Sequence, residues 1–131
     1  MKKYKVEGFA FIGRTFDEYQ KMFGLTKDEL KGNTFLDCPA GACSFVSEAH
    51  KKGIQATACD IEYGKPFKQF QEQCDKEVEK IKIGFSGAEE LFDWSFYGNL
   101  DHLLTYRKKA GKLFLEDFQK RPDYYVQVKL P

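Results

Sequence analysis

The stretch "FLDCPAGACSF", residues 35–45, combines an apolar strand, a tight turn and the start of a helix. Asp37 ends the strand, and Gly41 lies in the turn before the apolar helical run. Gly53 marks the end of that helix, and "IQATACD", residues 54–60, has the composition of a second strand. Strand, turn, helix and strand within about thirty residues form a βαβ unit with parallel strands and a right-handed crossover. The sequence therefore predicts an α/β fold.

Helical signals lie on both sides of this unit. Thr15 and Glu18 have capping-box spacing and predict a helix over 16–23 that stops at Gly24, and Thr26 caps a second short helix. Both helices precede the first strand, so the predicted fold starts with an N-terminal helix.

The segment 65–122 is predicted to be a helical insertion between the second and third strands. Apolar residues at helical spacing follow Pro66, a second helix is predicted from the Ser86–Glu89 box, and a third over 100–119. The closing "PDYYVQVKLP", from residue 122, has the alternation of a third strand. No repeat or composition shift divides the chain, so residues 1–131 are interpreted as a single domain.

Charge and apolar content exclude several classes of protein. The 21 Lys and Arg residues nearly balance 20 Asp and Glu, for a net charge of +1, which argues against a nucleic-acid groove or a polybasic membrane patch. No apolar run is long enough for a signal peptide or a membrane span, so a cytoplasmic protein is expected. The four cysteines lack paired ligand spacing and the two histidines lie in unrelated segments, so no metal site is expected.

The turn itself indicates the kind of ligand. A helix N-terminus behind a small turn favours a phosphate or carboxylate, and Asp60, about twenty residues after Asp37, ends the second strand where an acid accepts both ribose hydroxyls. Only one glycine of the dinucleotide fingerprint is present and no P-loop exists. Asp37 would repel a pyrophosphate but suits a ligand with an ammonium group.

Each of these residues also has a purely structural interpretation. Asp60 can cap the turn after its strand, and Asp37 can stabilise its own turn without any ligand. Cys43 is expected to pack at the helix start, where the helix N-terminus can lower its pKa and leave the thiol reactive.

"FLDCPAGACSF" followed by "ATACDIEYG" resembles motif I and the next acidic motif of the class I S-adenosylmethionine-dependent methyltransferases. The first motif of that family is an acid followed by three alternating glycines. Asp37 takes the place of the acid, and Pro39, Gly41 and Cys43 take the places of the glycines. The preceding "IGRTFDEYQKMFGL" is similar to a segment before motif I in a bacterial subgroup, so the resemblance is best over residues 12–64.

The resemblance implies S-adenosylmethionine as cofactor and a Rossmann-like fold. Asp37 and the backbone around Gly41 would face the methionine part, Asp60 would hold the ribose and Ile61 would line the adenine side. The preceding segment would close over the site, with the Arg14 guanidinium beside the methionine carboxylate. The implied cofactor-binding residues are Arg14, Tyr19, Asp37, Pro39, Ala40, Gly41, Asp60 and Ile61.

The family's sheet has seven strands, whereas this chain offers three, in the expected order 3-2-1, before it ends at "VKLP". We therefore expect a truncated, cofactor-binding N-terminal portion that is catalytically incomplete, with no assignable catalytic residue or methyl acceptor. The first strand would be an exposed apolar edge, which predicts a homodimer through this edge or nearby apolar surface. Two alternatives stay open: a non-catalytic half-Rossmann protein that binds a partner through its aromatic helices, and an NAD-binding oxidoreductase fragment, which Asp37 disfavours.

Overall fold

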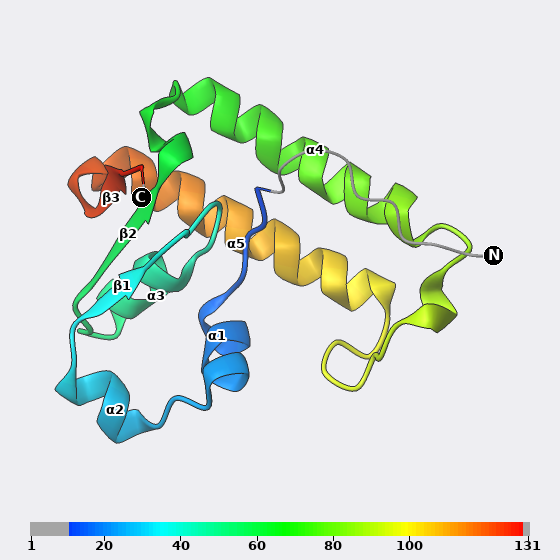
Figure 1. Ribbon diagram of the computed structural model, residues 1–131, viewed down its shortest axis with the longest axis horizontal. Coiled ribbons are helices and arrows are strands. Elements are labelled where there is room, and N and C mark those ends of the chain that lie inside the picture. The colour runs from blue at the N-terminus through cyan, green and yellow to red at the C-terminus, as the bar shows by residue number, and fades with distance from the viewer. Residues whose placement is uncertain (1–10, 130–131) are drawn as a thin grey trace.

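The computed structural model describes residues 11–129, in which three parallel strands form one sheet and long helices pack against it (Figure 1). The elements follow in the order α1 (Phe16–Phe23), α2 (Lys27–Gly32), β1 (Phe35–Asp37), α3 (Phe45–Lys51), β2 (Ala56–Asp60), the 3-10 turn η1 (Ile61–Gly64), α4 (Phe67–Phe85), η2 (Glu89–Leu91), α5 (Leu100–Lys120), η3 (Pro122–Tyr124) and β3 (Tyr125–Gln127).

The βαβ unit predicted from residues 35–60 is present as β1, α3 and β2. Leu36 lies opposite Thr57 in the parallel ladder between β1 and β2, and Cys59 lies opposite Val126 in the ladder between β2 and β3. The sheet order is β1-β2-β3, so β2 is central and β1 is an edge strand. These findings confirm the α/β class and the three parallel strands.

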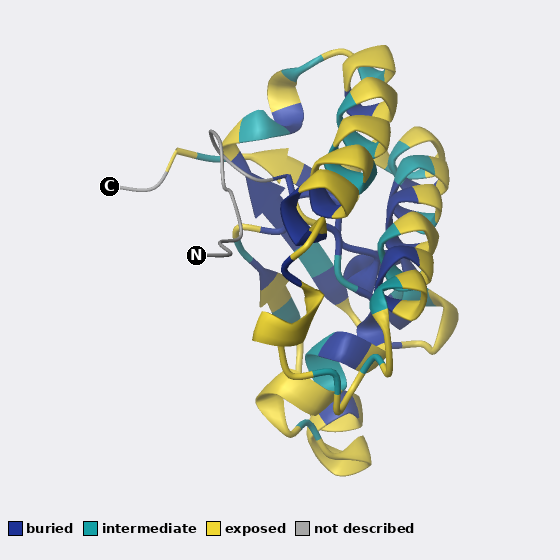
Figure 2. Ribbon diagram, turned by 90° about the vertical axis from the view of Figure 1, so that its right-hand side faces the viewer, coloured by how far each residue is buried: buried dark blue, intermediate teal, exposed yellow. Residues whose placement is uncertain are grey.

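The two faces of the sheet differ in burial. Ala56, Ala58 and Tyr125 point toward the helices and are buried, whereas Leu36 and Val126 on the opposite face are 69% and 42% exposed. Figure 2 shows the helices packed on one side of the sheet. On the face of Leu36 and Val126, Cys59 of the central strand is nevertheless buried, at 4% exposure, so the exposed apolar side chains there belong to the edge strands β1 and β3.

Aromatic rings fill the layer between the sheet and the helices. Phe70 of α4 and Phe114 of α5 are fully buried, with ring centroids 5.8 Å apart, and both rings contact Tyr63 after β2. The near half of the segment predicted as an insertion is therefore part of the main core. Its far half has a separate cluster, formed by Ile81, Phe85, Leu103 and Leu104.

Local capping signals correctly predicted the first helices. Thr15 and Glu18 form the complete capping box of α1, and Gly24 ends the helix with a φ of 61°. Thr26 caps α2 by accepting a hydrogen bond from the Glu29 amide.

The helix predicted from the Ser86–Glu89 box is wrong. In the described chain α4 continues to Phe85, and residues 86–99 form a loop that contains only the short turn η2. Gly87 and Gly98 adopt φ values of 71° and 87°, which helices do not permit, so two α-helices, not three, separate β2 from β3. Within residues 11–129, no helix combines the length and apolar character needed to cross a bilayer.

Candidate functional site

A pocket of about 430 Å³ lies at the carboxyl end of β1, between that strand, α1 and the start of α3. Its walls combine aromatic and aliphatic side chains with one acid and one guanidinium. The lining residues are Arg14, Tyr19, Met22, Phe23, Leu25, Phe35, Leu36, Asp37, Cys38, Pro39 and Phe45. Carboxyl ends of parallel strands are where α/β sheets bind ligands.

Asp37 is the buried acid of this pocket, with only 8% of its surface exposed. Its Oδ1 accepts a hydrogen bond from the Tyr19 hydroxyl at 2.8 Å, whereas its Oδ2 is buried and has no hydrogen-bond partner. Burial raises the pKa of Asp37 to about 6; the Tyr19 hydrogen bond opposes this rise and the charge of Asp60 adds to it. The carboxylate is mostly ionised at neutral pH and lacks one donor, so it suits a cationic N–H group.

Arg14 supplies the positive charge in the pocket. Its side chain is 32% exposed, and its Nη1 lies 3.9 Å from Glu18 Oε2, at the long limit of an ion pair. The pocket thus offers a buried carboxylate and a solvent-reachable guanidinium, which together match the ammonium and carboxylate of a zwitterionic amino acid.

Cys43 lies beside this pocket as a buried packing group. Its Sγ contacts the Tyr19 hydroxyl at 3.2 Å and accepts a hydrogen bond from the Arg14 amide at 3.3 Å. Burial and the charge of Asp37 raise the pKa of the Cys43 thiol to about 11. The lowered pKa considered from the sequence is therefore wrong, and the thiol stays protonated at neutral pH.

Gly41 is required by contacts within the chain. It has a φ of 53°, and a Cβ there would lie 3.0 Å from the Ile12 carbonyl oxygen. Its amide donates to Asp60 Oδ2 at 2.9 Å, and its carbonyl accepts from the Tyr63 hydroxyl at 2.7 Å. The close approach predicted at this glycine is thus made by the segment before α1, and the neighbouring Ala40 is only 1% exposed.

Asp60 joins the turn after β1 to the turn after β2. Besides the Gly41 amide on Oδ2, its Oδ1 accepts the Glu62 amide at 2.9 Å and so caps η1. This is the capping role considered from the sequence, although each oxygen retains a lone pair for a further donor. Ile61, the next residue, is 55% exposed at the end of β2.

Of the eight residues predicted from the sequence, the structure brings four together around the pocket: Arg14, Tyr19, Asp37 and Pro39. The other four lie outside its lining, and two of them, Asp60 and Gly41, are hydrogen-bonded to each other. The predicted segments therefore meet in space at one end of the sheet.

Sequence reasoning missed a buried charge network under α1. Glu18 is 2% exposed, and its Oε2 accepts hydrogen bonds from Arg107 Nη1 at 2.7 Å and from the Tyr97 hydroxyl. Burial raises the pKa of Glu18, but the charge of Arg107 and hydrogen bonds from Tyr97 and Thr15 outweigh it and hold the pKa below its ordinary value. Glu18 looked only like a helix cap, because its partner lies 89 residues away.

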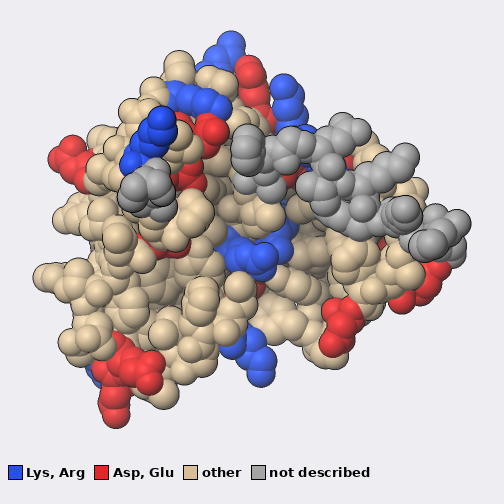
Figure 3. All heavy atoms as spheres, viewed as in Figure 1, with Lys and Arg blue, Asp and Glu red and all other residues tan. Residues whose placement is uncertain are grey.

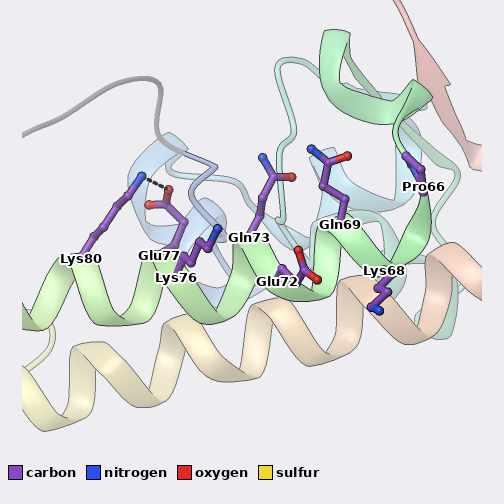
Figure 4. Close-up of a pocket in the computed structure, with 8 residues that line it drawn as sticks. All are labelled: Pro66, Lys68, Gln69, Glu72, Gln73, Lys76, Glu77 and Lys80. Carbon is purple, nitrogen blue, oxygen red and sulfur yellow. Dashed lines mark hydrogen bonds and ion pairs between the residues drawn. The ribbon is translucent and has the colours of Figure 1, made fainter.

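A second hollow, of about 540 Å³, lies on the outer face of α4 (Figure 4). Its described lining comes from residues 66–80 alone, with lysine, glutamate and glutamine side chains spread along the helix and Lys80 paired with Glu77 at 3.4 Å. The side chains are spread along the helix, and one of them, Gln73, has its Oε1 buried without a hydrogen-bond partner. Within residues 11–129, no group of three or more His, Cys, Asp or Glu is placed to hold a metal ion.

Sequence comparison relates this chain to an archaeal protein without a known activity. It is 29% identical over 132 residues to the uncharacterized protein MJ0045 of Methanocaldococcus jannaschii, an alignment that covers all of this chain and 59% of that protein. No protein-family model matches the sequence. No solved structure matches it either.

Proposed function

We propose that this chain is the cofactor-binding N-terminal part of a class I S-adenosylmethionine-dependent methyltransferase, with a partial Rossmann-like fold. The observation that carries the proposal is the buried, unpartnered Oδ2 of Asp37 on a pocket at the end of β1. An unpaired buried carboxylate oxygen is costly in a folded protein, so its presence favours a ligand that donates to it.

The opposite charges in the pocket favour a ligand that has both the ammonium and the carboxylate of an amino acid. Asp37 would bind the ammonium group of the methionine part, and Arg14 would bind its carboxylate. Tyr19 would hold Asp37 in place through its hydroxyl, which already donates to Oδ1. A pyrophosphate fits this pocket poorly, because it would bring negative charge against Asp37, so an NAD-binding fragment is disfavoured.

The neighbouring strand end would receive the nucleoside. Asp60 ends β2 with one free lone pair on each oxygen, and the exposed Ile61 follows it. The ribose hydroxyls would donate to Asp60 and the adenine would lie against Ile61, while Ala40, Gly41 and Pro39 form the turn between the two ends. The cofactor's sulfonium activates its methyl group for in-line attack.

Calorimetric titration tests this assignment. S-adenosylhomocysteine contains the amino-acid end, whereas methylthioadenosine lacks it. Asp37→Asn should therefore lower the affinity for S-adenosylhomocysteine by about tenfold or more and leave the affinity for methylthioadenosine nearly unchanged. Asp28→Asn, on the exposed first turn of α2, is the matched control. Equal losses for both ligands, or NAD binding more tightly than either, would contradict the proposal.

We further propose that the exposed edge of β1 and nearby apolar surface support a homodimer. Leu36 on this edge is 69% exposed, and Met22 and Phe23 beside the same pocket are 52% and 62% exposed. An unpaired strand edge next to apolar side chains favours pairing with another chain. Light scattering after size-exclusion chromatography checks this, and a clean monomer at high concentration would reject it. If no nucleotide binds but the dimer forms, the non-catalytic interaction protein becomes the better interpretation.

A further inference from the structure

Two cysteines, Cys38 and Cys59, lie side by side at the carboxyl ends of β1 and β2. Asp37 lies opposite Ala58 in the parallel ladder, so the next residue of each strand brings Cys38 alongside Cys59. The Ala40 amide donates to the Cys59 carbonyl at 3.0 Å and holds the turn after β1 against β2. Side chains alternate between the two faces of a sheet, so both thiols follow residues of the helix-covered face and share the opposite face.

The two thiols interact in the reduced protein. A hydrogen bond joins the Cys59 side chain to that of Cys38. Neighbouring strands lie about 4.8 Å apart, which falls within the roughly 4.4–6.8 Å between Cα atoms that a disulfide requires. A bond between the two sulfurs therefore needs only local adjustment of the side chains, and β1 can stay paired with β2.

Solvent reaches the two thiols to different extents. Cys38 is partly exposed and lines the pocket of about 430 Å³ at the end of β1, whereas Cys59 is only 4% exposed. A reagent in solution therefore meets Cys38 first, with Cys59 directly beside it. An accessible thiol next to a second, resolving thiol is the arrangement of redox-active cysteine pairs.

The surroundings of the pair do not stabilise a thiolate. Burial, the interaction with Cys38 and the charges of Asp37 and Asp60 raise the pKa of Cys59 to about 11. The strands lie in front of α3 in Figure 1, and Figure 3, from the same side, shows mostly uncharged surface over β1. Dithiols that resist oxidation are those whose reduced form is stabilised as a thiolate. Cys59 has no such stabilisation to lose when it enters a disulfide.

We propose that Cys38 and Cys59 form a reversible intramolecular disulfide on reaction with a low-molecular-weight disulfide of the glutathione class. The Cys38 thiolate attacks one sulfur of this oxidant, forms a mixed disulfide and releases one thiol. Cys59 then loses its proton, attacks the Cys38 sulfur and releases the second thiol. Two electrons pass from the protein to the oxidant, and the two protons of the cysteines end on the released thiols.

The other two cysteines are placed differently. Cys43 Sγ contacts the Tyr19 hydroxyl and accepts from the Arg14 amide, and Cys74 lies on α4 against Gly111. A bond between Cys38 and Cys59 would tie the end of β1 to the central strand and remove a free thiol from the pocket wall. The inference is independent of the proposed function, because the chemistry needs no nucleotide and its product is a covalent bond.

Mass spectrometry of the full chain tests the pair. The reduced protein is incubated with oxidised glutathione, its remaining thiols are alkylated in denaturant, and the chain is cleaved at Lys51 and Lys52, which lie between the two cysteines. We expect a chain lighter by two hydrogens, two of the four cysteines alkylated, one cross-linked peptide pair, and full reversal by dithiothreitol. Absence of this link, or a link between chains in its place, would overturn the proposal.

Serine variants assign the two sulfurs. Cys59→Ser should stop at the mixed disulfide on Cys38, and wild type should release that glutathione at least about tenfold faster, because attack within the chain replaces attack by a second molecule. Cys43→Ser and Cys74→Ser are the matched controls and should form the link within about twofold of the wild-type rate. Loss of the link in Cys43→Ser, or its persistence in Cys38→Ser, would overturn the proposal. Circular dichroism confirms that each variant is folded.

Oxidation in urea shows whether the fold creates the pair. In the unfolded chain a Cys38–Cys43 bond closes a much shorter loop than a Cys38–Cys59 bond and should dominate. The Cys38–Cys59 bond should form at least about tenfold faster in the folded chain than in urea. Equal rates in the two conditions would mean that the fold does not place the two thiols together, which would overturn the proposal.

Discussion

Replacing Asp37 by asparagine should stabilise the free protein while it weakens the proposed binding of S-adenosylhomocysteine. The pKa of Asp37 is raised to about 6 from an ordinary value of 3.8, mainly because burial disfavours the charged form. The folded protein therefore holds this proton more tightly than the unfolded chain does. This proton's contribution to the unfolding free energy is fully present below about pH 4 and is lost as pH rises through 6. At pH 7 the wild-type protein contains an ionised, desolvated carboxylate that the Asp37→Asn variant lacks.

The size of this effect follows from the pKa. A rise of about two pKa units corresponds to about 3 kcal/mol of unfolding free energy at about 1.4 kcal/mol per unit. The asparagine NH2 group would take the place of the unpartnered Oδ2 and would itself lack an acceptor. That unsatisfied donor lowers the gain in unfolding free energy by about 1 kcal/mol. The Tyr19 hydroxyl can still donate to the asparagine carbonyl. We therefore expect a net gain of about 2 kcal/mol at pH 7.

Urea denaturation of both proteins between pH 4 and pH 7 measures this difference. The variant's advantage should grow with pH, from near zero or slightly negative at pH 4 to about 2 kcal/mol at pH 7. A variant that is less stable than wild type at pH 7, or a stability difference that does not change with pH, would refute the reasoning. Asp28→Asn again serves as the exposed control, with no pH-dependent gain expected.

Four further outcomes follow from the geometry. S-adenosylhomocysteine binding should weaken about tenfold from pH 7 to pH 5 as Asp37 protonates, and calorimetry at both pH values checks the slope. Glu18→Ala should lower unfolding free energy by about 3 kcal/mol, because it leaves the buried Arg107 charge without its carboxylate, as urea melts will measure. Phe114→Ala, which empties a fully buried site, should lower it by about 3–5 kcal/mol in the same assay. Gly41→Ala should cost about 1–3 kcal/mol, because of its positive φ and the contact with Ile12, and thermal melts will detect it.

Short-range signals in the sequence predicted most of the secondary structure. The Thr15–Glu18 box and Gly24 bound α1, and Gly53, with a φ of 74°, ends the turn after α3. Each signal depends on backbone groups within one or two turns of the residue, so the information is local. The Ser86–Glu89 pattern shows the limit of such signals, because the preceding helix extends to Phe85 and Gly87 takes a left-handed conformation.

Contacts between residues far apart in the chain could not be predicted from the sequence. The sequence around Glu18 does not indicate its partners Arg107 and Tyr97, which lie 89 and 79 residues further along the chain. Such pairs form because the fold brings distant segments together, and a single sequence contains no record of that proximity. Arg14, Tyr19, Asp37 and Pro39 line one pocket, and of these only Asp37 and Pro39 could be placed there from the position of a strand end.

The two acids of the predicted motif, Asp37 and Asp60, differ in how their carboxylate oxygens are bonded. Asp60 has a hydrogen bond to each oxygen from a backbone amide, at Gly41 and at Glu62, and so fixes the turns that shape the end of the sheet. Asp37 has one oxygen bonded and one left without a donor. A ligand that displaced the Asp60 carboxylate would break the hydrogen bonds that fix both turns. A ligand that donates to Asp37 Oδ2 would instead relieve the free-energy penalty of that unpaired oxygen, which is already present in the free protein. Ligand identity should therefore depend on Asp37, and Pro39 and Cys43, at the positions of the family's glycines, should affect affinity through the shape of the turn.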